Sequence, residues 1–535
     1  MDGRCKPAFP KEAQKASLSA GFFTSGTFTA KGKPAWFSCQ RIYSNACAFL
    51  ECFLHPYLFI GFKSRRQKMQ KTILGAAIAA ICGFGTSAAM AQQASTSKVE
   101  LWGIADAAIR HTNNEGADKG SLTKMIGGGM SQSRWGINVE EDLGGGTKAL
   151  VHLEHRFNLD TGEKDATAPF FQLSYIGLQG PYGRLTMGRQ WNVLFDVVSS
   201  TYASFPYSPY MDAYKPELGM AAGARTSNSL KYLLATPDRR WVGALQYSFH
   251  EGNQNTSAVE NTLAAAAPGL INSQLPPGAP SVTGATTLGQ IASAIGPQNL
   301  AALMSGVKST INNADPNSPL GQAVAPSLSP IATSSLKTFG GFLRYSQDGI
   351  SVGGGYLRTH LPAGTKLDAW TLGGSYRKDK LYVNLGYGAN KIKNRETFNQ
   401  TANSTISDIA KFEARRLVDQ TIINGFWQGQ TNGGFLAGDS DKRTMYKLGF
   451  GYQITPQINA GIHYYHAKQK GSASGNYNGK ADFVVALANY AFSKRTDAYF
   501  GVDHTKVRGG EDMYLDRTSK ARSRTGITAG LRHRF

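Results

Sequence analysis

Residues 525–535, the last of the chain, read TGITAGLRHRF, and apolar and polar residues alternate along them. One face of an extended strand here would carry Ile527, Ala529, Leu531 and Phe535, and the other would carry Thr528, Arg532 and Arg534. A soluble protein has little reason to end on such a strand. A transmembrane β-barrel does, because its wall needs an apolar face for lipid, a polar face for the lumen and aromatic residues at the membrane interface. The ending therefore predicts the last strand of a barrel.

The same alternation recurs upstream. Residues 381–390 alternate between an apolar set that begins at Leu381 and a mostly polar or glycine set that ends at Asn390. Residues 133–140 and 149–157 alternate in the same way. A period of two residues indicates β-strands with two different faces. A stretch of about ten residues suffices for a tilted strand to cross the membrane.

Counting such stretches predicts an all-β fold, a 16-stranded antiparallel transmembrane β-barrel. The even number fits a single-chain bacterial barrel. The predicted strands start near Val99, Met130, Thr147, Pro169, Arg184, Thr226, Arg240, Lys337, Ile350, Leu367, Lys380, Asp441, Gln457, Lys480, Arg495 and Ser523. Short turns with turn-forming residues separate alternate pairs, at 143–146, 180–183, 237–238, 348–349 and 455–456. Wall side chains cannot fill a lumen of this size, so we expect an aqueous channel.

The start of the chain indicates export. Residues 69–91 resemble a secretory signal peptide, with Lys68 and Lys71, an apolar run from Ile73 to Phe84 and a small-residue cleavage pattern that ends at Ala91. We expect residues 1–68 to be either an over-called start or a disordered leader, and residues 92–535 to form the barrel. All five cysteines precede residue 92. Their absence afterwards suits a chain that crosses an oxidising periplasm unfolded.

The net charge of the whole chain is +21, and residues 92–535 hold 45 basic and 33 acidic residues, a net charge of +12. A basic balance often indicates nucleic-acid binding. Here the basic residues are scattered along alternating strands, and export excludes nucleic acid as a natural partner. The charge belongs either to a solvated surface or to a positive lumen that favours anions.

Three connections between predicted strands are unusually long, and long loops in compact proteins are usually functional or disordered. Residues 252–335 are rich in Ala, Pro, Ser and Gly with almost no charge, and residues 393–440 include a possible helix over 406–424. We expect both to be external loops. Residues 191–225 contain many apolar side chains, such as Phe195 and Val198. We expect this third connection to fold into the lumen and pack there.

Segments along the chain resemble the trimeric general porins of Gram-negative outer membranes. They are VELWGIAD (99–106), SRWG (133–136), EDLGGG (141–146), YIGL (175–178), GRQ (188–190), RTSNSLKY (225–232) and the ending GLRHRF (530–535). Each segment is weak alone, but together they run in family order from residue 99 to residue 535. The resemblance implies an outer-membrane channel for passive diffusion of small hydrophilic solutes and ions.

The resemblance also implies a pore constriction, in which basic wall residues face acids on the inward-folded third loop. Arg134 and Arg189 match wall arginines, Arg225 or Lys231 could complete the cluster, and the acids would be Asp196, Asp212 and Glu217. Strict alternation puts Arg189 on the outer face with Met187, so only a bulge or the strand end would turn it inward. Opposed charges across a narrow aqueous gap would orient dipolar solutes, and an excess of one sign would attract counter-ions.

For partners, the resemblance implies a homotrimer, outer-membrane lipid and the barrel-assembly machinery, with Phe535 as the assembly signal. Small residues on the early strands, Gly103, Ala105, Ala107 and Gly136, would allow neighbouring walls to approach closely, or would accommodate barrel curvature. No cofactor or metal is expected.

Two rival functions would also suit a barrel. A barrel enzyme would need a nucleophile or paired acids near a histidine, but His152 and His155 lie on opposite faces of one strand, as do His463 and His466. A structural or adhesive barrel with a plugged lumen is the other rival. Large stepwise conductance in a planar bilayer would separate both from a porin.

Overall fold

The structure is a computed structural model, and it describes residues 97–116, 118–165, 169–204, 219–220, 222–251, 255–312, 319–333, 336–428, 440–472, 475–515 and 520–535. All the described residues belong to one compact unit, the second of two, which spans residues 87–535. The predicted leader (1–68) and signal peptide (69–91) lie outside the described residues, so they remain expectations.

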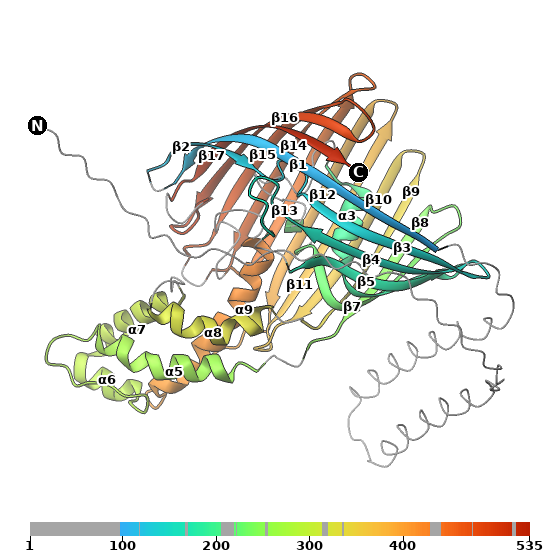
Figure 1. The fold of residues 1–535 in the computed structure, drawn as a ribbon. Coiled ribbons are helices and arrows are strands. Elements are labelled where there is room, and N and C mark those ends of the chain that lie inside the picture. The colour runs from blue at the N-terminus through green and yellow to red at the C-terminus, as the bar shows by residue number, and fades with distance from the viewer. Residues whose placement is uncertain are drawn as a thin grey trace, which may run out of the picture. The chain divides into compact units, whose positions relative to one another are not determined.

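Strands dominate the second unit (Figure 1). They are β1 (Ser97–Glu115), β2 (Gly120–Ile126), β3 (Arg134–Gly144), β4 (Thr147–Arg156), β5 (Phe171–Gly180), β6 (Gly183–Trp191), β7 (Arg225–Ala235), β8 (Trp241–Ser248), β9 (Thr338–Gln347), β10 (Ile350–His360), β11 (Lys366–Lys378), β12 (Leu381–Lys393), β13 (Lys442–Gln453), β14 (Ile458–Lys470), β15 (Gly479–Ala491), β16 (Thr496–Gly509) and β17 (Ser523–Arg534).

These strands form one antiparallel sheet that closes on itself, because β1 pairs with β17 on one side and with both β2 and β3 on the other. β3 pairs with the first half of β1, from Ser97 to Ile104, and β2 pairs with the second half, from Ala108 to Glu115. β2 and β3 are therefore two parts of one wall strand. The wall has 16 strands, which confirms the predicted barrel.

The interruption between β2 and β3 is held by a buried carboxylate. Asp106 of β1 accepts hydrogen bonds from the backbone N–H of Ser131 at 2.7 Å, from that of Met130 at 3.3 Å and from the Tyr499 hydroxyl at 2.5 Å. These contacts replace the ladder hydrogen bonds that the wall strand gives up there. The second predicted strand is wrong in this respect, since a start at Met130 misses β2. The other 15 starts agree with the structure to within two residues.

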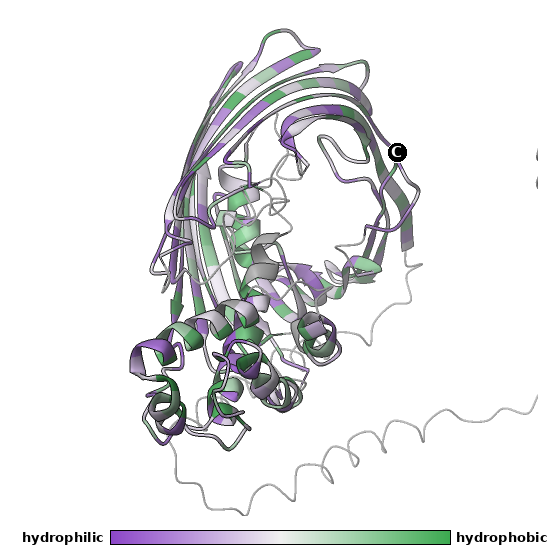
Figure 2. Cartoon of the chain, turned by 90° about the vertical axis from the view of Figure 1, so that its left-hand side faces the viewer, coloured by the Kyte–Doolittle hydropathy of each residue, from purple (hydrophilic) through white to green (hydrophobic). Residues whose placement is uncertain are grey.

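Burial along the strands confirms the predicted faces, and the colours in Figure 2 alternate accordingly along several strands. In β12, Leu385 is 60% exposed on the outer face, whereas Asn384 and Asn390 on the inner face are almost fully buried. In β17, Leu531 is 54% exposed and Thr528 and Arg532 are buried. The barrel therefore presents its apolar side chains outwards, as lipid contact requires.

The turns between strands divide the barrel into two ends. At one, named the short-turn end here, a few residues join the pairs β3–β4, β5–β6, β7–β8, β9–β10, β11–β12, β13–β14 and β15–β16. At the other, named the long-loop end, the connections are longer and carry most helices: α3 (Val193–Thr201), α5 (Ser257–Asn272), α6 (Leu288–Ile295), α7 (Pro297–Asn312), α8 (Pro319–Thr333) and α9 (Ile406–Gln428).

Helices α5 to α9 pack against one another (Figure 1). Val259, Leu263, Ala267 and Ile271 of α5 recur every four residues and are buried, as on one face of a helix. Arg415 of α9 pairs with Glu260 of α5 at 3.0 Å and with Glu396 at 2.7 Å. The predicted helix over 406–424 is confirmed as α9, four residues longer. The four helices within 252–335 were not predicted.

In the described part of the chain, no helix has both the length and the apolar character needed to cross a membrane.

Candidate pore constriction

The connection after β6 begins as a helix that packs against the inside of the wall. Asn192 caps α3, its side-chain oxygen accepting the Phe195 N–H at 2.7 Å. Val193, Leu194, Val197 and Val198 are fully buried. Gly355 and Gly353 of β10 lie beneath Leu194 and Val197, so close that a Cβ atom would lie 3.1 and 2.9 Å from those side chains. Glycines on this part of the inner wall make room for the helix.

The loop then crosses further strands. The Tyr202 hydroxyl hydrogen-bonds Thr371 of β11, and its ring lies over Gly373 and Gly386. The Ser204 hydroxyl meets the Tyr465 hydroxyl of β14 and accepts from Lys447 of β13 at 3.4 Å. The described part of the loop therefore lies along the inner wall from β10 to β14, which confirms that residues after Trp191 fold inward. Asp212 and Glu217 lie outside the described residues.

Three arginines of the wall surround one buried carboxylate. Glu154 of β4 is 3.6 Å from Arg134 of β3, 3.3 Å from Arg156 of β4 and 3.7 Å from Arg225 of β7. The guanidinium of Arg225 also stacks on Trp191, 3.8 Å from the ring centre. Among the described residues, these three guanidinium groups and one carboxylate give this part of the wall a formal excess of positive charge.

Arg189 lies next to this cluster. Strict alternation would place Arg189 on the outer face unless a bulge or the strand end intervened, and the structure has a bulge here. The β6–β7 register shifts between Gly188 and Gln190, and Gly188 has φ +128°. A Cβ at Gly188 would lie 2.2 Å from a backbone oxygen, so only glycine fits. Arg189 donates to the Gln172 backbone oxygen at 3.1 Å and to the Ser227 hydroxyl at 2.6 Å, and it interacts electrostatically with Arg156.

Lys231 does not join the arginines. Its ammonium donates to Asp196 at 2.7 Å and to the Trp191 backbone oxygen at 3.0 Å. Wall lysine and loop acid therefore form a direct ion pair, rather than facing each other across a gap. Of the expected constriction residues, the structure brings together Arg134, Arg189 and Arg225, and joins Lys231 to Asp196.

Sequence reasoning missed two members of the cluster, Glu154 and Arg156. The signal was present, because His152, Glu154 and Arg156 occupy successive inner positions of β4. His152 of the same row stacks on Trp102 and Tyr175, with ring centres 5.7 and 5.1 Å apart. The resemblance to the family implied arginines on other strands and no charged residue on β4.

The wall near the closing seam has balanced charges. Arg110 of β1 pairs with Asp503 of β16 at 2.7 Å, and Arg532 of β17 pairs with Asp497 of β16 at 2.9 Å. All four side chains are at least nine-tenths buried. The group of Arg134, Arg156 and Arg225 thus lies on other strands, β3, β4 and β7.

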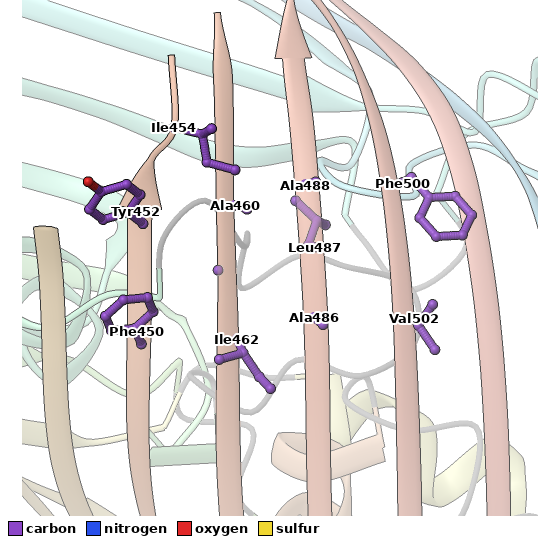
Figure 3. Close-up of a pocket in the computed structure, with 11 residues that line it drawn as sticks. Phe450, Tyr452, Ile454, Ala460, Ile462, Ala486, Leu487, Ala488, Phe500 and Val502 are labelled. Atoms are coloured by element: carbon purple, nitrogen blue, oxygen red, sulfur yellow. The ribbon is translucent and has the colours of Figure 1, made fainter. Parts of the chain in front are cut away.

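An apolar groove of about 680 Å³ lies on the outer face, over β13 to β16 near the short-turn end (Figure 3). Ala460, Gly461, Ala486 and Ala488 form its floor between larger side chains such as Phe450 and Phe500. It lies on the opposite side of the wall from the loop that contains α3, and none of the described residues that line it has a carboxyl, basic or thiol group. Among the described residues, no group of three or more His, Cys, Asp or Glu side chains could hold a metal ion.

The family profile described as Gram-negative porin matches residues 76–510. The chain belongs to this family. The predicted location in the outer membrane is thereby confirmed, and so is the prediction that the chain is not an enzyme, because this is a family of channels.

Two curated relatives are similar to parts of the chain. An outer membrane porin protein of Bordetella pertussis is 32% identical over 208 residues, covering 36% of this chain and 51% of the relative. Outer membrane porin protein 32 of Delftia acidovorans is 32% identical over 174 residues, covering 31% of this chain and 45% of the relative. The chain thus spans about half the length of the curated relatives it matches.

Among solved structures, the anion-selective porin from Comamonas acidovorans is similar, with a TM-score of 0.50 and 19% identity. The match covers 82% of this chain and all of that chain. At this identity the likeness supports the fold, a porin barrel.

Proposed function

We propose that this porin forms a water-filled channel for passive diffusion of small hydrophilic solutes and ions, with a modest preference for anions. The observation that carries the proposal is the group of Arg134, Arg156 and Arg225 around the single carboxylate of Glu154, with Arg189 beside it. The name of the similar Comamonas acidovorans structure, an anion-selective porin, agrees with this preference.

A positive cluster on the channel wall raises the local concentration of anions. The ion pair between Lys231 and Asp196 contributes no net charge, which is one reason to expect a modest preference. Screening lengths are about 10 Å at 0.1 M salt and about 3 Å at 1 M. The preference should therefore fade as salt rises.

The test is the reversal potential of single channels under a KCl gradient. We expect the wild type to prefer anions, Arg134→Ala with Arg189→Ala to lose that preference, and Glu154→Gln to strengthen it. Asp379→Asn, in an exposed turn with φ 50° that asparagine tolerates, is the matched control and should change nothing.

A cation-selective wild type, or an unchanged potential in the double variant, would show that the arginine cluster does not set selectivity. Absence of stepwise conductance would instead favour the barrel with a plugged lumen.

We also propose that three copies assemble, with outer-membrane lipid around them and the barrel-assembly machinery inserting them. Of the small residues first noted, Ala105 and Ala107 face outwards and suit a close contact between walls. Gly103 instead lies under the Phe535 ring, and Gly136 lies under Trp102 on the inner face. Native mass measurement in mild detergent should give a trimer, and a monomer would contradict the proposal.

A further inference from the structure

Six lysines lie on the outer face of five adjacent strands, close to the long-loop end. We name them the lysine row: Lys391 of β12, Lys442 of β13, Lys468 and Lys470 of β14, Lys480 of β15 and Lys506 of β16. All six are exposed. They alternate with inner-face residues such as Gln469 and Ala481, so their stems leave the barrel on the lipid side.

The pairing register makes these lysines direct neighbours. Lys391 pairs with Lys442, which pairs with Lys470, and Lys468 pairs with Lys480. Like charges directly opposite one another in a sheet are destabilising. Counter-charges from outside the strand pair would therefore stabilise a row of them on one face.

No carboxylate among the described residues forms an ion pair with these lysines. In the residues that the structure describes, none of the six ammonium groups forms an ion pair or hydrogen bond. Two outer-face carboxylates lie directly opposite end members of the row, Asp368 opposite Lys391 and Asp482 opposite Lys506. Both pair with other cations: Asp368 with Arg358 at 2.5 Å and Lys393 at 2.7 Å, and Asp482 with Arg508 at 3.0 Å.

The row lies at the level expected for lipid headgroups. Immediately below it on the same strands are Tyr446, Tyr464 and His466, an aromatic girdle of the kind found at membrane interfaces. Apolar side chains follow, and Ile462, which lines the groove of Figure 3, is six residues from Lys468. That separation is about 20 Å along a strand. Acyl chains below a headgroup at the row would thus lie over β13 to β16.

Other parts of the rim differ. On β3 to β5, the outer face at the long-loop end carries Trp135, His155 and Phe170, which pack against one another without lysine. At the short-turn end, β13 and β15 carry Tyr452 and Tyr490. The lysine row thus belongs to the long-loop end and to β12 to β16.

We propose that the lysine row binds the phosphate groups of a phosphorylated glycolipid in the outer leaflet, which faces the long-loop end of the barrel. This rests on the proposed insertion in the outer membrane with the long loops external. A basic cluster at the headgroup level attracts anionic lipid, at about 1 kcal/mol for each lysine near the surface. Several phosphates on one headgroup could each contact two neighbouring lysines.

The experiment measures lipid binding by native mass spectrometry of the refolded full-length protein in detergent. The probes are bisphosphorylated lipid A, dephosphorylated lipid A and phosphatidylglycerol. Lys468→Gln with Lys480→Gln removes the central pair. Lys378→Gln with Lys494→Gln, at exposed positions of the opposite end, makes the same charge change as a control. Conductance of every variant is recorded in parallel, which separates this proposal from the channel function.

We expect the central pair variant to bind bisphosphorylated lipid A about thirtyfold more weakly than the wild type, which corresponds to about 2 kcal/mol. The control variant should bind it like the wild type, and dephosphorylated lipid A should bind weakly to all. An equal loss in the control, or no loss in the central variant, would overturn the site. Equal binding of phosphatidylglycerol, with the same dependence on Lys468 and Lys480, would overturn the glycolipid as its ligand.

Discussion

At the scale of single residues, the barrel closes where Phe535 meets Gly103. Their backbones exchange two hydrogen bonds of 3.0 Å, and the terminal ring lies over the glycine. A Cβ atom at residue 103 would lie 2.2 Å from the ring. The glycine is therefore required by the aromatic residue at the end of the chain, which is itself 48% exposed.

We predict that Gly103→Ala destabilises the folded barrel by about 1–3 kcal/mol, the usual cost of overpacking. The measurement is the free energy of unfolding in urea, in detergent. In a Phe535→Ala background the same substitution should cost almost nothing, because the ring that it displaces is gone. Equal costs in both backgrounds would show that the contact does not matter.

Removal of Phe535 should impair assembly more than stability. A terminal aromatic residue contributes about 1.5–3 kcal/mol of burial at most. From the resemblance to porins we propose that it also serves as an assembly signal. We expect a strong fall in outer-membrane level but a refolded barrel that withstands heating in detergent. Wild-type levels of the shortened chain in the outer membrane would contradict this role.

At the scale of elements, Asp419 of α9 connects the group of helices α5 to α9 to the barrel. This side chain is 4% exposed and accepts the Ala363 N–H, in the β10–β11 turn, at 3.1 Å. Burial raises the pKa of Asp419 above its usual 3.8. A raised folded-state pKa means that the folded state binds the proton more tightly. Its contribution to stability is thus present at low pH and is lost as the pH rises through the folded-state pKa.

We predict that Asp419→Asn slows hydrogen exchange of α9 at pH 7 and has little effect below pH 3.8. Asp408→Asn, at the start of α9, is the contrasting variant. Hydrogen bonds from Thr405 lower the pKa of Asp408, so its contribution is present at neutral pH and lost on acidification. Asp408→Asn should speed exchange at pH 7. Equal responses of the two variants would contradict these assignments.

At the scale of the whole molecule, the helices α5 to α8 are an insertion between two paired strands. Ser248 at the end of β8 pairs with Thr338 at the start of β9, so a short turn could join them. The main contacts of α5 to α8 are with one another and with α9. The barrel therefore does not need them for its own closure.

We predict that replacing residues 253–335 with a short Gly-Ser linker leaves a barrel that still refolds, with its β-sheet circular dichroism and heat resistance in SDS retained. Helix α9 should become sensitive to protease, because it loses the partner that Arg415 and its apolar face contact in α5. A chain that no longer refolds would show that the helices take part in forming the barrel.

The sequence by itself determined the barrel wall. Each strand must present one face to lipid and one to the lumen. Apolar and polar residues therefore alternate with a period of two, which the sequence shows without tertiary information. Ile527 and Leu531 on one face, with Thr528 and Arg532 on the other, are placed by that rule alone. It located 15 strand starts and the inward fold after Trp191. It also marked Arg189 as a position that required a bulge.

Only the tertiary structure decided which side chains meet. Glu154 and Arg156 join Arg134 because β3 pairs with β4, and the folded wall brings Arg225 of β7 within 3.7 Å of Glu154. Local periodicity contains no such distances. The split of β2 from β3 depends on Asp106 and Tyr499, which are 393 residues apart in the chain. The helices between β8 and β9 have short apolar repeats that become stable only when α9 packs against them, since isolated helices of this length are marginal.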